Sequence, residues 1–303
     1  MATPVLIDCD PGHDDAIAIL LALASPELEL RGVTTVAGNQ TLEKTTANAL
    51  RVLEFAGHGD VPVAAGADRP LVREPFVAAY VHGESGLDGP DLPQPSGAAV
   101  DQHAVDFLAE RVGGATLVAV GPLTNVALLF ALHPHARPDR IVIMGGAIAE
   151  GNVTPAAEFN IWADPEAARR VFESGLDITM IGLDVTHKAL MTRGHAERLR
   201  AAGRVGTMVA ELYDFYSIFH RDTYGTDDSP IHDAVAVAHV LRPELVETLR
   251  RHVAVDCFSE LCRGRTVVDL WRRTSNEPNA HVGVGVDADA LLELVLDRIA
   301  SLT

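Results

Sequence analysis

Apolar stretches rich in β-branched residues recur along the chain, and most are separated by segments with helical periodicity. The stretches cover residues 4–9, 28–36, 61–65, 115–120, 140–144 and 178–183. Strands that alternate with helices are typical of right-handed βαβ units, in which the strands run parallel. The pattern therefore predicts an α/β protein built on a largely parallel sheet.

Helical patterns follow several of these strands. The apolar residues from 16 to 23 fit a long helix directly after the first strand. A second helical pattern, rich in aromatic residues, begins after about residue 205. It leads to His232 and Asp233, which open a further apolar helix.

A glycine-rich segment near the C-terminus, residues 283–288, loosely matches a dinucleotide-binding pattern. Only 15 residues follow Ala288 (303 minus 288), which is too few for the βαβ unit that such a motif must open. We expect a final strand that turns into a helix there.

Two connections are long for structureless loops. Residues 66–100 are rich in proline and glycine, and residues 145–163 behave in the same way, so both are candidate functional loops. No linker, repeat or low-complexity tract separates the parts of the chain. We therefore expect one domain over residues 1–303.

The composition and net charge of the chain disfavour several classes of partner and location. The net charge is -18, which disfavours a nucleic-acid partner or an anionic membrane surface. No apolar run is long enough to span a bilayer, and the N-terminus lacks the basic region of a secretory signal. The chain has three cysteines, Cys9, Cys257 and Cys262, an odd number that suggests a reduced compartment such as the cytoplasm. Their spacing favours inert thiols over a zinc site.

The densest chemical signal is a group of four carboxylates within residues 8–15. Asp8, Asp10, Asp14 and Asp15 fall between the first strand and the first helix. In an open α/β sheet this turn lies where ligands bind. Like charges held so close repel one another, and a divalent cation with hard oxygen ligands is the simplest way to offset the repulsion.

Each acid also has a structural interpretation. Asp14 can cap the helix, and Asp15 can be a first-turn acid that the helix dipole favours. Asp8 can be a hydrogen-bonded carboxylate at the end of the strand. These roles do not explain Asp10, which strand alternation places on the same side as Asp8. A metal site is the better interpretation of the group.

Further polar or glycine residues fall just after other predicted strands. They are Asn39, residues 121–125, residues 144–146 and Asp184. Taken singly, each can be a helix cap or a tight turn. Taken together they predict one rim at the carboxyl edge of the sheet.

These motifs resemble the nucleoside hydrolase family, which cleaves the N-ribosidic bond of ribonucleosides. The resemblance spans nearly the whole chain. It rests on Asp8-x-Asp10-Pro-Gly-x-Asp14-Asp15-Ala-x-Ala, Val36-Ala-Gly-Asn39, Gly121-Pro-Leu-Thr-Asn125, Met144-Gly-Gly, Gly151-Asn152, Ala157-Glu-Phe-Asn160, Asp164-Pro-Glu-Ala-Ala and His232-Asp233. It implies an open, mostly parallel, doubly wound, Rossmann-like sheet in a single domain, and a homodimer or homotetramer.

The resemblance also implies a set of ligands. Ca²⁺ would be held by Asp10, Asp15, Asp233 and the backbone carbonyl of Val120, with water and the ribose diol completing its shell. The remaining residues carried over would contact the sugar: Asp14, Asn39, Met144, Asn152, Glu158, Phe159 and Asn160.

The chemistry of the reaction assigns further roles. Ca²⁺ leaves its water mostly undissociated at neutral pH, so a carboxylate must take the proton, and Asp10 is the expected base. The departing base needs a proton, for which His232 and His82 are the first candidates. His232 can instead only orient Asp233, and His82 can simply organise its glycine loop. The other histidines have no local argument for a chemical role.

The sequence leaves the preferred base open. His82, His232 and Tyr224 resemble the pyrimidine-preferring branch of the family. His220 stands where that branch often has an amide, and Tyr216 is bulkier than the usual residue there. We expect a preference for uridine and cytidine, with a purine-accepting inosine-uridine hydrolase as the alternative.

Two other function classes compete with a hydrolase. A haloacid-dehalogenase-type phosphatase also begins with Asp-x-Asp and needs Mg²⁺, but residues 11–15 and the missing downstream lysine depart from its pattern. A non-catalytic nucleoside or sugar sensor would have lost the base or the proton donor, whereas Asp10 and His232 are both present. The hydrolase is the preferred hypothesis.

Overall fold

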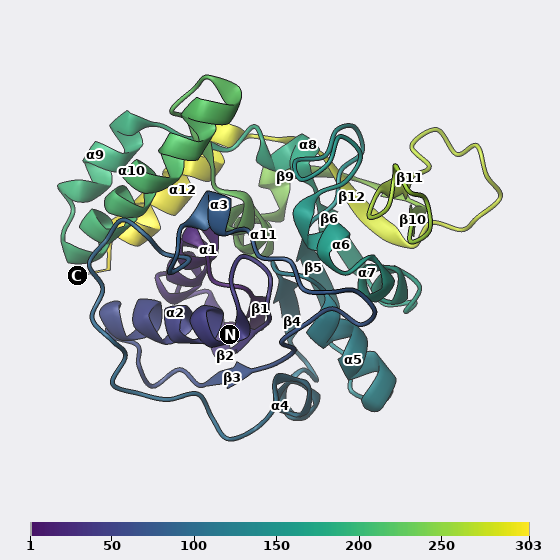
Figure 1. Ribbon diagram of the computed structural model, residues 1–303, viewed down its shortest axis with the longest axis horizontal. Helices are drawn as coiled ribbons and strands as arrows, with labels where there is room; N and C mark the ends of the chain where they lie inside the picture. The colour runs from purple at the N-terminus through teal and green to yellow at the C-terminus, as the bar shows by residue number, and fades with distance from the viewer. Residues whose placement is uncertain (1, 303) are drawn as a thin grey trace.

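The computed structural model describes residues 2–302 and shows an α/β fold around an eight-stranded sheet (Figure 1). Its strand order is β3-β2-β1-β4-β5-β6-β12-β9. Two further two-stranded sheets pair β10 with β11 and β7 with β8. The strands are β1 (Thr3–Cys9), β2 (Leu28–Thr35), β3 (Val63–Ala65), β4 (Thr116–Ala119), β5 (Arg140–Met144), β6 (Ile178–Ile181), β7 (Leu190–Met191), β8 (Ser229–Pro230), β9 (Val246–Arg251), β10 (Val253–Val255), β11 (Thr266–Val268) and β12 (Ala280–Val286).

The helices follow the strands in the alternation that the sequence predicts. They are α1 (His13–Leu23), α2 (Leu42–Phe55), α3 (Ala79–His82), α4 (Ala104–Arg111), α5 (Thr124–Leu132), α6 (Phe159–Ala163), α7 (Pro165–Phe172), α8 (Leu183–Thr186), α9 (Arg193–Arg200), α10 (Arg204–Tyr224), α11 (His232–Leu241) and α12 (Ala288–Ala300), with a 3₁₀ turn η1 (Pro243–Leu245). The six predicted strands match β1 to β6 to within about two residues, the usual scatter of element ends. The glycine-rich C-terminal segment is a strand followed by a helix, as expected.

The main sheet is parallel except at one edge. Every neighbouring pair from β3 to β12 runs parallel, and only β9 pairs antiparallel, against β12. The strand order therefore reverses at β1, with β2 and β3 on one side and β4 to β6 on the other. Such a reversal opens a crevice beyond the carboxyl ends of the strands. The turn after β1 carries the acid-rich segment into this crevice.

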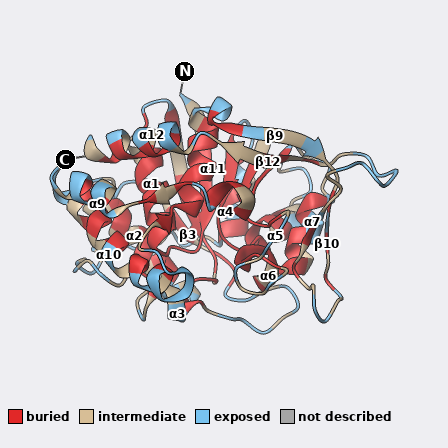
Figure 2. Ribbon diagram, turned by 90° about the horizontal axis from the view of Figure 1, so that it is seen from above, coloured by how far each residue is buried: buried red, intermediate tan, exposed pale blue. Residues whose placement is uncertain are grey.

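Helices cover both faces of the sheet because its strands are apolar on both sides. In β1, Val5 and Ile7 pack into one buried cluster, with side chains of α1, α2, α10, α11 and α12. Leu6 points the opposite way and packs with side chains of α4, α5 and α7. Figure 2 shows the buried residues concentrated in these central elements. The predicted doubly wound, single-domain α/β architecture is confirmed.

Helix α1 is buried on all sides. Ten of its eleven residues are buried, including the two acids of its first turn. It packs against α11, the helix that begins with His232 and Asp233. Two segments more than 200 residues apart in sequence therefore bring their acidic N-termini together (232 minus 13 is 219).

The two long connections lie beside the same crevice. Residues 66–100 contain only the short helix α3, which ends at His82. Residues 145–163 contain an isolated bridge between Thr154 and Ala157 and then α6. Within residues 2–302, no helix is both long and apolar enough to cross a membrane.

Candidate active site

A cavity of about 250 Å³ lies at the carboxyl edge of the sheet. Carboxylate, amide and backbone groups line one end, and imidazole and aromatic rings line the other. The predicted site residues on its wall are Asp14, Asn39, His82, Val120, Met144, Asn152, Glu158, Phe159, Asn160, Tyr216, His220, Tyr224, His232 and Asp233. The fold thus gathers almost the whole predicted set around one space.

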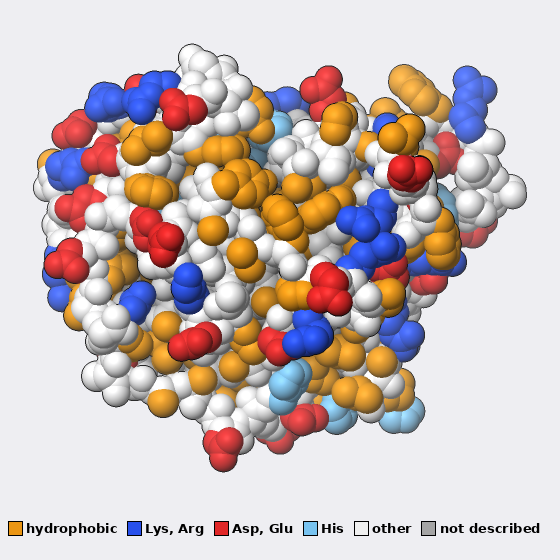
Figure 3. All heavy atoms as spheres, viewed as in Figure 1, with side chains coloured by type: hydrophobic (Ala, Val, Ile, Leu, Met, Phe, Trp, Pro, Cys, Tyr) orange, Lys and Arg blue, Asp and Glu red, His pale blue; other side chains and the backbone are white. Residues whose placement is uncertain are grey.

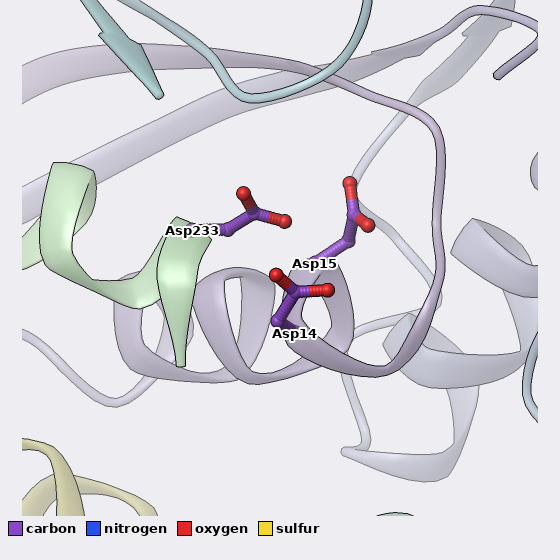
Figure 4. A group of neighbouring side chains, drawn as sticks. All are labelled: Asp14, Asp15 and Asp233. Carbon is purple, nitrogen blue, oxygen red and sulfur yellow. The ribbon is translucent and has the colours of Figure 1, made fainter. Parts of the chain in front are cut away.

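Three carboxylates form a tight cluster at the polar end. Asp14, Asp15 and Asp233 each offer an oxygen, and these oxygens lie within 4.8 Å of one another. Figure 4 shows that the first two rise from α1 and the third from α11, with their carboxylates turned toward one another. Each lies in the first turn of its helix, where the positive end of the helix dipole favours an anion.

Asp10 and Asp15 lie just behind the cavity wall. The backbone amide of Asn39 donates to Asp10 Oδ2 at 2.6 Å, and Asp10 Oδ1 is buried without a hydrogen-bond partner. A Cβ atom on Gly121 would lie 2.6 Å from that oxygen, so only glycine fits there. Asp15 accepts from the amides of Asp10 and Gly12 and from Asn39 Nδ2.

Without a bound cation, the buried carboxylates in this part of the cavity are unfavourable, because burial and mutual repulsion oppose their ionisation. Burial raises the pKa of Asp14 to about 8, and the neighbouring charge of Asp15 adds to the effect. Burial, with repulsion from nearby carboxylates, also holds the pKa of Asp10 and of Asp233 well above the usual range. Burial also raises the pKa of Asp15.

The donor set fits a hard divalent cation. It consists of oxygen atoms alone, carries several negative charges, and includes an Asp10 oxygen that lacks any hydrogen-bond partner among residues 2–302. Ca²⁺ and Mg²⁺ prefer such ligands, and a positive charge here offsets the repulsion that raises the pKa values. The structure therefore supports a metal site and leaves the identity of the ion open.

Asp8 serves the fold instead of the site. Thr34 Oγ1 and Asn125 Nδ2 both donate to its Oδ1, at 2.5 Å and 2.8 Å. The hydrogen-bond partners of Asp8 differ from those of Asp10, although alternation along the strand places the two side chains on the same side. Burial raises its pKa to about 6. The strand-end interpretation of this acid is the one that its contacts support.

The loop after β5 is organised by Glu158 and Asn160. The Glu158 carboxylate caps α6 by accepting from the amides of Asn160 and Ile161, and it also accepts from Gly146 N at 2.8 Å. Burial raises its pKa to about 7. Asn160 Nδ2 donates to the carbonyl of Val120 at 2.7 Å, so this carbonyl is held at the cavity wall.

Comparison with known proteins identifies the family of this protein. Residues 5–293 match the family model described as inosine-uridine preferring nucleoside hydrolase. The chain belongs to this family. As a nucleoside hydrolase it is an enzyme, and the predicted family resemblance is confirmed.

Relatives of known name agree with the assignment. This nucleoside hydrolase is 51% identical over 308 residues to a pyrimidine-specific ribonucleoside hydrolase RihA of Klebsiella pneumoniae, and 52% identical over 307 residues to one of Escherichia coli. Each alignment covers 99% of both chains. Among solved structures, a purine-preferring ribonucleoside hydrolase from Gardnerella vaginalis superposes with a TM-score of 0.94 at 35% identity. A plant nucleoside hydrolase, PpNRh1, gives 0.93 at 35% identity, and both cover 99% of this chain.

The far end of the cavity in this nucleoside hydrolase is built from rings. Tyr216 stacks near His82, with ring centroids 5.6 Å apart, and packs edge-on to His220 at 4.5 Å. His220 in turn stacks on Tyr224, which is half exposed at the mouth. Burial lowers the pKa of His82 and of His232 well below the usual value.

The sequence analysis did not single out His187, which lines the cavity, and it placed Asp184 on the rim of the site. His187 lines the cavity and its ring centroid lies 5.5 Å from that of His232. Its position just after the strand at 178–181 is the signal that could have found it. Asp184, predicted on the rim, is instead bonded to the backbone amides of Ile148 and Ala149 and is absent from the cavity wall.

His13 is a further residue that sequence reasoning set aside as a surface or cap position. It is buried, and its ring stacks against those of Phe215 and Tyr216. Burial lowers its pKa to about 4. Its Nδ1 atom lies 3.0 Å from Nδ1 of His82, so it supports the cavity wall from behind.

Proposed function

We propose that this nucleoside hydrolase cleaves the N-glycosidic bond of pyrimidine ribonucleosides to free base and ribose, with Ca²⁺ as its resident ion. The observation that carries the proposal is that one cavity combines a carboxylate cluster and amide groups with a set of stacked aromatic and imidazole rings. A ribonucleoside combines a sugar with several hydroxyls and a planar base. The names of the relatives at 51% and 52% identity support the pyrimidine preference.

Asp10, Asp15, Asp233 and the carbonyl of Val120 would hold the ion. Calcium accepts six to eight oxygen ligands in flexible geometry, which suits this set. When bound, the ion supplies a positive charge beside the ribose diol. Asp14 belongs to the tight carboxylate cluster as well and lines the cavity, as Asp233 does, so its assignment to the sugar rests on the family resemblance.

The sugar would be held by the polar side chains around it. Asp14, Asn39 and Asn160 offer carboxylate and amide groups to the ribose hydroxyls, together with Asn152 and Glu158. Met144 and Phe159 supply apolar contacts on the same wall. Hydrogen bonds fixed in this way position the anomeric carbon for attack.

Asp10 is the proposed general base. Its carboxylate is fully buried behind the cavity wall, and an ionised carboxylate at that position can accept a proton. It would take a proton from the attacking water. The surrounding carboxylates would stabilise the positive charge that develops on the sugar in an oxocarbenium-like transition state.

His232 is the proposed donor of a proton to the departing base, directly or through a short relay with His82 and Tyr224. All three line the cavity. A positioned acid lowers the barrier because a pyrimidine leaves poorly as an anion. Tyr216 and His220 would pack on the base.

A purine-accepting enzyme is the second candidate. It is favoured by the close superposition on the purine-preferring hydrolase, with a TM-score of 0.94. At 35% identity that likeness is weaker than the sequence similarity to the pyrimidine-specific relatives. Membership of the family argues against the phosphatase and the sensor.

The deciding experiment measures ribose release from uridine, cytidine, inosine, adenosine and guanosine with Ca²⁺ present. We expect the highest kcat/KM for uridine or cytidine. Equal or higher values for the purine nucleosides would overturn the pyrimidine preference. Release of 2-deoxyribose from 2′-deoxyuridine should be slower than ribose release from uridine by about 10⁴ or more, because a site built around a hydroxyl rejects the analogue without it.

We also propose a cytoplasmic homodimer or homotetramer. The three cysteines are free, which is consistent with a reduced compartment. Large apolar side chains are exposed near β10 and β11, at Phe258, Leu261 and Trp271, on the part of the molecule that projects in Figures 1 and 3. Light scattering on the eluting protein would measure the mass, and a monomer would contradict the proposal.

A further inference from the structure

Among residues 2–302, four histidines line the cavity, and His187 differs from the other three. In each of those three, Nδ1 lies within hydrogen-bond distance of another protein group. They are His82 beside His13, His220 beside the carbonyl of Tyr216, and His232 beside Thr186. His187 makes its hydrogen bonds within residues 2–302 through its backbone amide. Both of its ring nitrogens are therefore available to a ligand.

The backbone of His187 is nevertheless fixed by its neighbours. The residue follows the last turn of α8, and its amide donates to the carbonyl of Leu183 at 3.0 Å. Two residues later, the carbonyl of Ala189 accepts from the amide of Ile231 at 3.1 Å, next to the pairing of β7 with β8. The short β7–β8 sheet therefore holds the end of α8 close to the start of α11.

The ring of His187 lies beside His232 on the cavity wall. The two ring centroids are 5.5 Å apart, and the ring planes are tilted by 59°. Leu190 and Pro230, which pair with each other across β7 and β8, line the same cavity. His187 is exposed, so it lies where the cavity opens to solvent. The aromatic residues proposed to pack on the base come from α10, and His187, Leu190 and Pro230 add a second wall.

An imidazole ring with two free nitrogens suits the polar edge of a nucleobase. Its two nitrogens can supply one N–H donor and one acceptor. Uracil and cytosine each present N–H and carbonyl groups along the edge of a planar ring. One such side chain can therefore bind either base.

We propose that His187 contacts the base of the bound nucleoside and hydrogen-bonds to its polar edge, which makes it a specificity-determining residue of the cavity. The inference rests on the proposed function for the identity of the substrate. The contact involves the base and neither the ribose nor the attacking water, so it stabilises the bound substrate and the transition state alike. Such uniform binding lowers KM and leaves kcat unchanged.

The direct test is binding of 5-fluorouracil, a pyrimidine base whose fluorine can be followed by ¹⁹F NMR. His187→Phe keeps a planar ring and removes both nitrogens, so the dissociation constant should rise by about three- to tenfold, the size of one lost hydrogen bond. His135→Phe is the matched control and should leave the affinity unchanged, because His135 is exposed and lies outside the cavity wall. Equal affinities of the wild type and His187→Phe, or no binding to the wild type, would overturn the proposal.

Steady-state kinetics separate contact with the base from support of His232. His187→Phe should raise KM for uridine by about three- to tenfold and keep kcat within about twofold. His187→Gln returns a hydrogen-bonding amide and should restore KM to within about twofold of the wild-type value. KM for p-nitrophenyl riboside should change by less than about twofold in both variants, because its aglycone lacks the N–H groups of a base. A fall in kcat at unchanged KM would assign His187 to support of His232 and overturn the contact.

Failure of this inference and failure of the proposed function give different results. Wild-type protein that binds 5-fluorouracil more tightly than His187→Phe does, but releases no ribose from any nucleoside, would contradict the proposed function alone. Ribose release from uridine with the same KM in the wild type and in His187→Phe would overturn the inference alone.

Discussion

Asp10 and Asp8 are two buried aspartates with opposite uses, two residues apart. Asp8 Oδ1 accepts from two neighbouring side chains, and its carboxylate supports the junction of β1, β2 and α5. Each residue has one buried carboxylate oxygen without a hydrogen-bond partner among residues 2–302, Asp8 Oδ2 and Asp10 Oδ1. The two differ in their charged neighbours, because Asp15 and Asp14 repel the Asp10 carboxylate, whereas the pKa of Asp8 is set by burial and its two hydrogen bonds.

This contrast yields a matched pair of substitutions. Asp10→Asn keeps an oxygen at the site but cannot accept a proton, so kcat for uridine should fall by about 10² or more. Asp8→Asn keeps the oxygen that Thr34 and Asn125 bond to, and should retain kcat within about threefold. The measurement is steady-state ribose release at saturating Ca²⁺. Near-normal turnover of Asp10→Asn with metal bound would remove it as the base.

His232 permits a test of proton delivery. His232→Ala should slow uridine hydrolysis by roughly 10² to 10⁴, the usual size of general acid catalysis. p-Nitrophenyl riboside should be affected little, since its leaving group is a stable anion. Both rates are measured at one pH with the same enzyme preparation. A similar loss on both substrates would instead indicate that His232 supports Asp233.

At the scale of elements, the loop after β5 and the short helix α6 depend on one carboxylate. Glu158 accepts from the amides of Asn160, Ile161 and Gly146, so it joins the helix to the glycine turn that follows β5. An α6 of five residues has too few internal hydrogen bonds to persist alone. The cap therefore positions Asn160, and with it the carbonyl of Val120.

Removing this cap should destabilise the fold as well as the site. Glu158→Ala leaves three amides without an acceptor and should lower the free energy of unfolding by about 2–4 kcal/mol. Glu158→Gln keeps one acceptor oxygen and should cost about half as much. Glu173→Ala, which removes an exposed ion pair with Arg169, serves as the control and should change stability by less than about 0.5 kcal/mol. Urea denaturation followed by circular dichroism measures all three.

At the scale of the whole molecule, buried carboxylates make stability depend on pH. The pKa values of Asp8, Glu158 and Asp14 are raised to about 6, about 7 and about 8. A carboxyl group with a raised pKa binds its proton more tightly in the folded state than in the unfolded state. Its contribution is therefore greatest below the unfolded pKa and is lost as the pH rises through the folded value.

The melting temperature of the metal-free protein should accordingly fall as the pH rises from about 7 to about 9, above the range in which buried histidines with lowered pKa values oppose the effect. Calcium needs ionised carboxylates, so the increase in melting temperature on adding Ca²⁺ should grow over the same interval. Thermal melts in chelator and in excess Ca²⁺ across this range provide the measurement, with Mg²⁺ in parallel. A calcium-induced increase that is independent of pH would show that the ion binds away from these groups.

Much of the arrangement could be predicted from local sequence. Strand and helix alternation determined the α/β class and the parallel sheet, because apolar periodicity reports burial on one or both faces. Polar residues just past strand ends indicated the edge where the site lies, since parallel strands end at one edge. The family resemblance placed Asn39, Asn160 and Asp233 at one site, and all three line the cavity.

Other features were decided only in three dimensions. Asp14 and Asp233 are far apart in sequence, and the packing of α1 against α11 brings their carboxylates together. His13 had no local signal of its own, because its role comes from the rings and hydrogen-bond partners that tertiary packing supplies. The sequence by itself determined which residues and strand ends could carry the chemistry. Tertiary structure decided which of them share a cavity, since burial, proton position and charge repulsion depend on neighbours across the fold.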